Sequence, residues 1–173
     1  LFLQQERRLT AAERGTAMHL VMQYLELGGP DPKEQVRRLT DRRLLTPQQA
    51  EAVDMERIRA FLATPLAQEI RQARQVWREY RFALLMPAAL YDPAAEGEEL
   101  MLQGVVDCAF RTEEGLVVVD FKTDRLAPGE EPQRAEEYRP QLEAYAQALE
   151  RVMEEKVCRK VLYFFSTGAT INL

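Results

Sequence analysis

Cysteine and histidine are scarce in this chain of 173 residues, which contains only Cys108, Cys158 and His19 of these types. Two cysteines are too few for a disulfide framework, and too few for the four thiolates that hold an iron–sulfur cluster. Both cysteines lie in apolar, strand-like segments, so we expect small buried hydrophobic side chains at these positions. Such cysteine usage is typical of a reducing compartment, which indicates a cytoplasmic location.

Long apolar runs and targeting signals are also missing. No apolar run approaches the roughly 18 residues that a membrane span requires, and no signal-peptide pattern opens the chain. We therefore expect no association with a membrane. The sequence has no G-x-x-x-x-G-K-[ST] phosphate loop, so any ATP-driven motor is expected outside this chain.

Positive charge is in deficit, since the net charge is −5 at pH 7, and this argues against tight autonomous binding of nucleic acid. The balance is uneven, because residues 1–85 carry 14 Lys and Arg against 11 Asp and Glu, whereas residues 86–173 carry 9 against 17. The arginines of the first half could contact phosphate groups, but such runs are more often solvated helix faces.

The most informative stretch runs from residue 102 to residue 124, which reads as two strands joined by the polar turn 112–115. If Thr112 faces Gly115, the register places Asp107 opposite Asp120, with Cβ atoms about 4.5–5.5 Å apart. Lys122 then points to the same face, because side chains in a strand alternate with period two. Two carboxylates this close remain ionised together only beside a cation, and oxygen ligands suit Mg²⁺, Mn²⁺ or Ca²⁺.

Alternation assigns Val106, Cys108 and Phe110 to the other face of this hairpin. The competing interpretation is an exposed hairpin with ordinary surface charges. Apolar residues on both faces argue against it, although a slip of one residue would break the register.

The remaining pattern predicts one domain, with a helical region over about 1–74 and an α/β core over about 75–173. Predicted helices start at Ala11, after a capping box formed by Thr10 and Glu13, and then cover 32–41, 47–63 and 65–73. Predicted strands cover 75–85, 102–111, 116–124 and 157–166. A further helix runs to about residue 155, and Pro140 must start or kink it. The predicted fold class is α/β, with a mixed central sheet flanked by helices.

These residues carry a family resemblance. The motifs Gly104-x-x-Asp107, Asp120-Phe121-Lys122-Thr123 and Gln141-x-x-x-Tyr145 occur in the order found in RecB-type nucleases of the PD-(D/E)XK superfamily, which this sequence resembles. Within that family it is similar to the nuclease domains of bacterial AddAB helicase–nucleases. Gly15-Thr16-x-x-His19 resembles the histidine motif of the family, and Glu79 resembles its strand glutamate. Phe121 stands where the family usually has tyrosine.

The resemblance implies a restriction-endonuclease-like fold and a role for each motif residue. The metal, Mg²⁺ or Mn²⁺, would be held by His19, Asp107, Asp120 and the backbone carbonyl of Phe121. Lys122 would act with the two aspartates in catalysis. The residues expected to face the substrate are Gln141, Tyr145, Glu79 and Thr123.

The implied activity is metal-dependent hydrolysis of DNA, as the exonuclease of an ATP-dependent helicase–nuclease in double-strand-break repair. The implied partners are single-stranded DNA, helicase domains of the same parent chain and an AddB-like subunit, with ATP used only by the helicase part. Three alternatives stay open: a silent nuclease-fold module for DNA binding or docking, a hydrolase with paired carboxylates as in glycosidases, and a Cas4-like nuclease. The missing iron–sulfur cysteines weaken the last of these.

Overall fold

The computed structural model describes residues 9–173, which fall into two units. Unit 1 contains the chain up to Gln72 together with Thr123–Arg125, and unit 2 contains Ala73–Lys122 and Leu126–Leu173. No helix within residues 9–173 has the length and apolar character needed to cross a membrane.

Unit 1 is helical, and its elements are α1 (Ala11–Tyr24), α2 (Pro32–Asp41), α3 (Pro47–Ala52), α4 (Met55–Leu62) and α5 (Pro65–Gln72). The predicted start of α1 is confirmed, because the Thr10 hydroxyl accepts from the Glu13 amide and the Glu13 carboxylate accepts from the Thr10 amide. These contacts satisfy donors that a helix N-terminus otherwise leaves unpaired.

The prediction of one helix over residues 47–63 is wrong. The chain becomes extended at Val53, with ψ of 125°, and the Asp54 side chain then accepts from the Arg57 amide at 3.2 Å. Asp54 therefore caps a separate helix, α4, which interrupts the apolar periodicity. Helix α1 ends at Tyr24, because Leu25 is already extended.

Unit 2 contains a five-stranded sheet in the order β1-β2-β3-β4-β5. Its strands are β1 (Val76–Pro87), β2 (Glu99–Arg111), β3 (Leu116–Lys122), β4 (Val157–Phe164) and β5 (Ala169–Asn172). Neighbouring strands are antiparallel except for β3 and β4, which are parallel and are connected through helix α6 (Glu131–Met153). The predicted mixed α/β sheet is confirmed.

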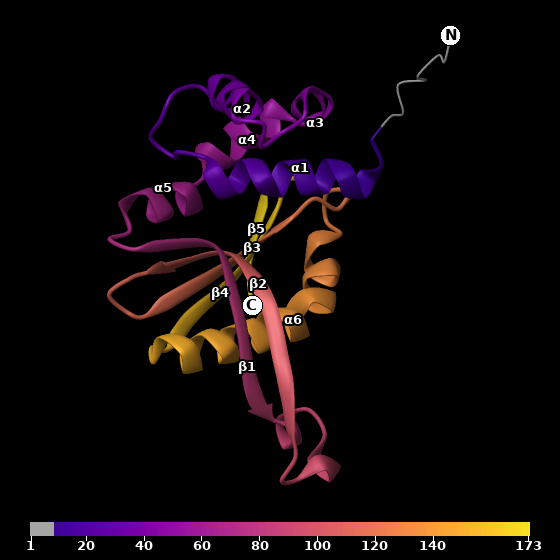
Figure 1. Ribbon diagram of the computed structural model, residues 1–173, viewed down its shortest axis with the longest axis vertical. Coiled ribbons are helices and arrows are strands. Elements are labelled where there is room, and N and C mark those ends of the chain that lie inside the picture. The colour runs from indigo at the N-terminus through magenta and orange to yellow at the C-terminus, as the bar shows by residue number, and fades with distance from the viewer. Residues whose placement is uncertain (1–8) are drawn as a thin grey trace. The chain divides into compact units, whose positions relative to one another are not determined.

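Strands β1 and β2 continue beyond the rest of the sheet as a two-stranded ribbon, with the short helices η1 (Ala88–Leu90) and η2 (Pro93–Ala95) at its far end (Figure 1). Strand β2 begins at residue 99, three residues before the predicted start. Strand β5 was not predicted, because its four residues are too short for a periodic pattern.

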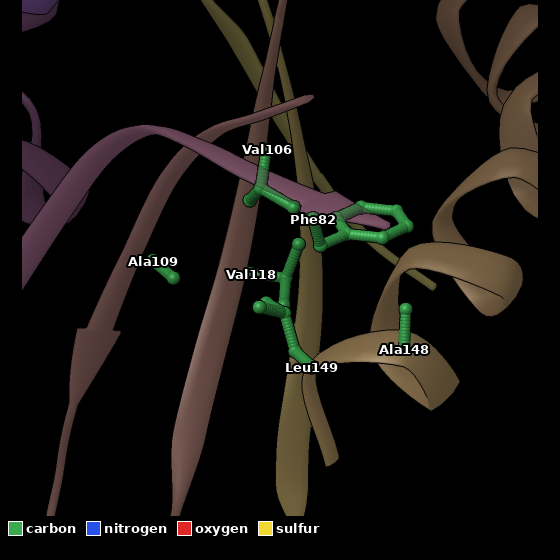
Figure 2. Packing of buried hydrophobic residues seen from close by; sticks show 6 residues of the cluster. All are labelled: Phe82, Val106, Ala109, Val118, Ala148 and Leu149. Carbon is green, nitrogen blue, oxygen red and sulfur yellow. The ribbon is translucent and has the colours of Figure 1, made fainter. Parts of the chain in front are cut away.

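Helix α6 packs against the sheet through two groups of buried side chains. In the first, Ala148 and Leu149 of α6 meet residues of β1, β2 and β3, as Figure 2 shows: Phe82, Val106, Ala109 and Val118. In the second, Ala135 and Leu142 of α6 meet Leu162 and Phe164 of β4. The helix continues through Pro140, which neither starts nor ends it.

The two cysteines differ in exposure. Cys108 is buried, as predicted, but Cys158 is exposed, so the prediction for Cys158 is wrong. Cys158 lies in the first half of β4, whose residues are less buried than those of the second half.

The alternation of β1 and β2 is interrupted at one place in both strands. Trp77 and Tyr80, three residues apart, pack against the same cluster, and Val106 and Ala109 belong to that cluster together. Residues three apart in a regular strand point to opposite faces. The predicted placement of Val106 on the face opposite to Ala109 is therefore wrong. The interruption falls at Glu79, whose φ of 49° is left-handed.

Gly104 gives a prediction about stability. A Cβ at this position would lie 2.8 Å from Phe82 Cζ and 2.8 Å from Tyr145 Cε1. We therefore expect Gly104→Ala to lower the free energy of unfolding by about 1–3 kcal/mol, since overpacking a core displaces neighbouring rings. Urea denaturation measures this change. A second substitution, Tyr145→Leu, is expected to relieve part of the clash, so additive losses would contradict the argument.

Candidate active site

The predicted register of the central hairpin is confirmed. The Thr112 amide donates to the Gly115 carbonyl at 2.9 Å, and β2 pairs with β3 from Arg111 opposite Leu116 to Cys108 opposite Val119. The pairing ends at Cys108 and Val119, one residue before Asp107 and Asp120, and the direct facing of these two carboxylates stays a prediction. These two carboxylates therefore stand where the paired part of β2 and β3 ends.

The backbone pairing of β2 with β3 ends at Cys108, and the next residue, Asp107, contacts β3 through its side chain instead. Its Oδ2 atom accepts a hydrogen bond from the Phe121 backbone amide at 2.8 Å. The carboxylate is thereby held against β3, at the point where the pairing of β2 with β3 has ended. A half-buried carboxylate fixed by a backbone donor is preorganised for binding a cation.

Glu79 brings a second carboxylate to the same place from β1. One oxygen of Glu79 and one of Asp107 lie within 4.8 Å of each other. Glu79 holds this position in a left-handed backbone conformation, with φ of 49°, which costs a non-glycine residue about 1–3 kcal/mol. The sequence placed Glu79 near the site through family resemblance, but no pattern revealed its unusual backbone.

Lys122 is held by three neighbours within unit 2. Its Nζ atom lies 2.5 Å from Asp120 Oδ2, donates to Gln141 Oε1 at 3.2 Å, and lies 3.7 Å from the centre of the Tyr138 ring. The Lys122 side chain is 12% exposed and that of Asp120 is 8% exposed. The structure thus joins Asp120, Lys122 and Gln141, which the sequence predicted as site residues. The contact of Tyr138 was not predicted.

Gln141 and Tyr145 share one face of α6, as their spacing of four residues predicts. The Gln141 amide nitrogen lies 3.1 Å from the Tyr145 hydroxyl and donates to it. The Tyr145 ring packs edge-on against Phe82, with ring centres 5.4 Å apart. Tyr145 therefore has a structural role in the core and a polar end that reaches the Lys122 network through Gln141.

Phe121 faces away from these polar groups. Its ring packs against Tyr163 and Phe165, with ring centres 6.4 Å and 5.8 Å away. The family tyrosine is thus replaced by a packing ring. Binding of a metal by the Phe121 carbonyl stays a prediction.

His19 and Thr123 belong to unit 1. His19 lies half-buried on α1, and Gly15, one turn earlier, is buried. A Cβ at Gly15 would lie 3.0 Å from Thr123 Oγ1, so glycine permits the close approach of α1 and Thr123 within this unit. The proposed roles of His19 in metal binding and of Thr123 toward the substrate stay predictions.

The donors gathered in unit 2 are oxygen atoms. Next to Asp107, burial raises the pKa of the Cys108 thiol to about 12. Two oxygens bound to one Mg²⁺ at about 2.1 Å lie up to ~4.2 Å apart, so the Glu79–Asp107 spacing fits a shared hard cation after a small side-chain movement. The ion pair of Lys122 and Asp120 argues against a glycosidase-type pair, in which both carboxyl groups flank the scissile bond.

The family follows from a comparison with known proteins. The chain matches the model of the PD-(D/E)XK nuclease superfamily over residues 1–171, so it belongs to that superfamily. It is similar to three bacterial proteins whose names describe them as subunits of ATP-dependent helicase/nucleases. The one from Acetivibrio thermocellus is 43% identical and aligns with 99% of this chain and 14% of its own length.

The relatives from Heliobacterium modesticaldum and Desulforudis audaxviator are 40% and 39% identical, and align with 99% and 97% of this chain. The alignments cover 13% and 14% of those proteins. The chain therefore corresponds to a small part of each relative. The matched family and the names of these relatives confirm the resemblance that the sequence motifs indicated.

Proposed function

We propose that this domain hydrolyses phosphodiester bonds of DNA with the help of a divalent cation, Mg²⁺ or Mn²⁺. The observation that carries the proposal is the arrangement at Lys122. Its ammonium group is fixed beside Asp120 and Gln141, and the Asp107 carboxylate accepts from the backbone amide of Phe121, between Asp120 and Lys122 in the chain. Acidic groups beside one fixed ammonium group suit a reaction in which negative charge develops on a phosphate.

The proposed ligands of the cation are Asp107, Asp120, the Phe121 carbonyl and His19. Glu79 supports the site as a further carboxylate, because one of its oxygens lies within 4.8 Å of an Asp107 oxygen. A bound divalent cation would polarise the phosphoryl oxygen and lower the pKa of a bound water. The choice of Mg²⁺ agrees with the carboxylate and carbonyl oxygens among the proposed ligands.

The chain's own residues then share the remaining tasks. Lys122 orients the attacking water and stabilises charge in the transition state, because a compact ammonium group acts as a point charge. Gln141 and Tyr145 present an amide and a hydroxyl that can hold a phosphate or a base of the strand. Thr123 follows Lys122 directly in the chain and is proposed as a further contact to the substrate.

We also propose the wider setting. The relatives are named as parts of ATP-dependent helicase/nucleases, which supports a role as the nuclease domain of such a machine. In this setting helicase domains of the same parent chain, together with an AddB-like subunit, deliver single-stranded DNA in the cytoplasm. The domain then trims the strand as an exonuclease during processing of double-strand breaks. The net charge of −5 favours delivery of the strand over independent capture.

Cation removal tests the proposal. We expect end-labelled single-stranded DNA to be degraded with Mg²⁺ or Mn²⁺, and to stay intact when EDTA removes the cation. Closed circular single-stranded DNA is the matched substrate, because an exonuclease needs an end and leaves it intact. The cleavage assay is run on this chain and on the full-length parent protein with its partner.

Two other outcomes would change the assignment. Cleavage of the circle would show endonuclease action and would contradict only the exonuclease part of the proposal. Inert protein in both preparations, without binding of Mg²⁺ or Mn²⁺ in calorimetry, would overturn the catalytic proposal. The domain would then be a nuclease-fold module for DNA binding or subunit docking.

A further inference from the structure

Tyr138 makes a contact with Lys122 that the proposed mechanism does not use. The Lys122 Nζ atom lies 3.7 Å from the centre of the Tyr138 ring. This is well inside the ~6 Å within which a ring face attracts a cation, and the attraction is strongest where water is excluded. The Lys122 side chain is only 12% exposed, so the contact is largely shielded from water.

The ring completes a set of three neighbours around the ammonium group. Asp120 contributes a carboxylate at 2.5 Å and Gln141 an amide oxygen at 3.2 Å. Both neighbours offer oxygen atoms, which can also bind a hard cation, and Asp120 is a proposed metal ligand. An aromatic face has no such donor and does not compete for a hard cation. Tyr138 can therefore hold Lys122 equally well before and after a cation binds.

Arg134, one helical turn before Tyr138, holds the ring. Its Nη2 atom donates to the Tyr138 hydroxyl at 3.0 Å, and its guanidinium carbon lies 4.8 Å from the ring centre. Arg134 is itself paired with Glu137 on the exposed side of α6. The ring also packs against the buried cluster of α6 and β4 residues. Its orientation is thus fixed at both ends.

We propose that Tyr138 is a positioning residue for Lys122: the ring face, anchored by Arg134, holds the ammonium group in its catalytic place. The role of Lys122 rests on the proposed nuclease function, whereas the contact itself can be tested without it. Lysine has a flexible four-carbon stem, so losing one of three neighbours lets the ammonium group leave its place for part of the time.

The test compares two variants with the unmodified protein. Tyr138→Phe keeps the ring and loses only the hydroxyl contact with Arg134, whereas Tyr138→Leu keeps apolar bulk and loses the ring. We expect kcat for single-stranded DNA to fall roughly tenfold in Tyr138→Leu and less than about threefold in Tyr138→Phe. KM for DNA is expected to change little in both, because Tyr138 is not placed against the substrate.

Nuclear magnetic resonance provides a readout that does not depend on activity. A ring face shifts nearby protons upfield, so the Lys122 ε protons are expected upfield of ordinary lysine positions in the unmodified protein and in Tyr138→Phe. The shift is expected to vanish in Tyr138→Leu. Tyr24→Leu is the matched control, because it removes another tyrosine under a cation, Arg42 at 5.9 Å, from unit 1.

Each outcome decides between positioning and mere packing. Ordinary ε-proton shifts in the unmodified protein would overturn the proposal, even if Tyr138→Leu failed to fold. Full kcat in a folded Tyr138→Leu variant would also overturn it. If the shifts behave as expected but neither this chain nor the full-length parent protein cleaves DNA or binds Mg²⁺ or Mn²⁺, the contact stands and the proposed nuclease function fails.

Discussion

Replacing Lys122 with methionine is expected to lower the rate of DNA cleavage at least a hundredfold. The ammonium group lies within hydrogen-bonding reach of Asp120 and Gln141, at the proposed reaction centre. A preorganised group that stabilises transition-state charge contributes roughly 10²–10³ in kcat. Methionine fills much of the same volume but carries no charge. The measurement is the single-turnover cleavage rate of end-labelled single-stranded DNA at saturating Mg²⁺.

The free energy of unfolding of Lys122→Met is expected to depend on Mg²⁺ more strongly than that of the unmodified protein. Lys122 and Asp120 are both largely buried, and removing one partner of a buried ion pair costs about 3–5 kcal/mol, because the other charge is left uncompensated. Lys122→Met should therefore unfold more easily than the unmodified protein in EDTA. Mg²⁺ should stabilise the variant more, since a cation at Asp120 restores compensation. The double variant Asp120→Asn/Lys122→Met is expected to recover stability but not cleavage.

Two controls separate charge placement from general effects. Lys160→Met removes a lysine that lies 3.8 Å from Glu143 in a more exposed pair, so activity and stability should barely change. Lys122→Arg keeps the charge but places a larger planar group in the same space, and we expect it not to restore cleavage. Undiminished cleavage by Lys122→Met would show that Lys122 has no catalytic part.

Local chemistry made the hairpin predictable from the sequence. A polar turn ending in glycine fixed the facing of Thr112 and Gly115, and the register then followed by counting outward to Cys108 and Val119. The start of α1 was predictable for the same reason, because Thr10 and Glu13 satisfy each other's amides within one turn. Both predictions depend on residues close together in the chain.

The interruption at Glu79 could not be predicted, because no residue there signals it. Left-handed backbone is expected of glycine or asparagine, whereas here it is adopted by a glutamate within a strand. The surrounding pairing of β1 with β2 supplies the energy that holds it, and that pairing is not local. The contact of Tyr138 with Lys122 was missed similarly, since it joins α6 to the end of β3.

Two substitutions of Asp107 are expected to have opposite effects on stability in EDTA. Asp107→Asn keeps an oxygen that can accept from the Phe121 amide and removes a negative charge near Glu79. It should be at least as stable as the unmodified protein, because like charges at this spacing repel by roughly 1–4 kcal/mol. Asp107→Ala leaves the Phe121 amide without this acceptor and should be about 1–3 kcal/mol less stable. Thermal unfolding in EDTA measures both.

Mg²⁺ should change the order in which the unmodified protein, Asp107→Asn and Asp107→Ala rank by thermal stability. Binding of Mg²⁺ stabilises the folded protein in proportion to affinity, and Asp107→Asn removes a charged ligand, so the unmodified protein should gain more stability than either variant. Cleavage should fall at least a hundredfold in both variants, because both lack the carboxylate.

Asp92→Asn is the matched control, since the Asp92 carboxylate also accepts a backbone amide, from Ala94 at 2.9 Å, but lies at the far end of the ribbon. Its response to Mg²⁺ should equal that of the unmodified protein. An equal response by Asp107→Asn would mean that Asp107 binds no cation and serves only to hold β3 in place. The left-handed backbone of Glu79 and its closeness to Asp107 would then need another explanation, because two neighbouring carboxylates repel each other when no cation lies between them.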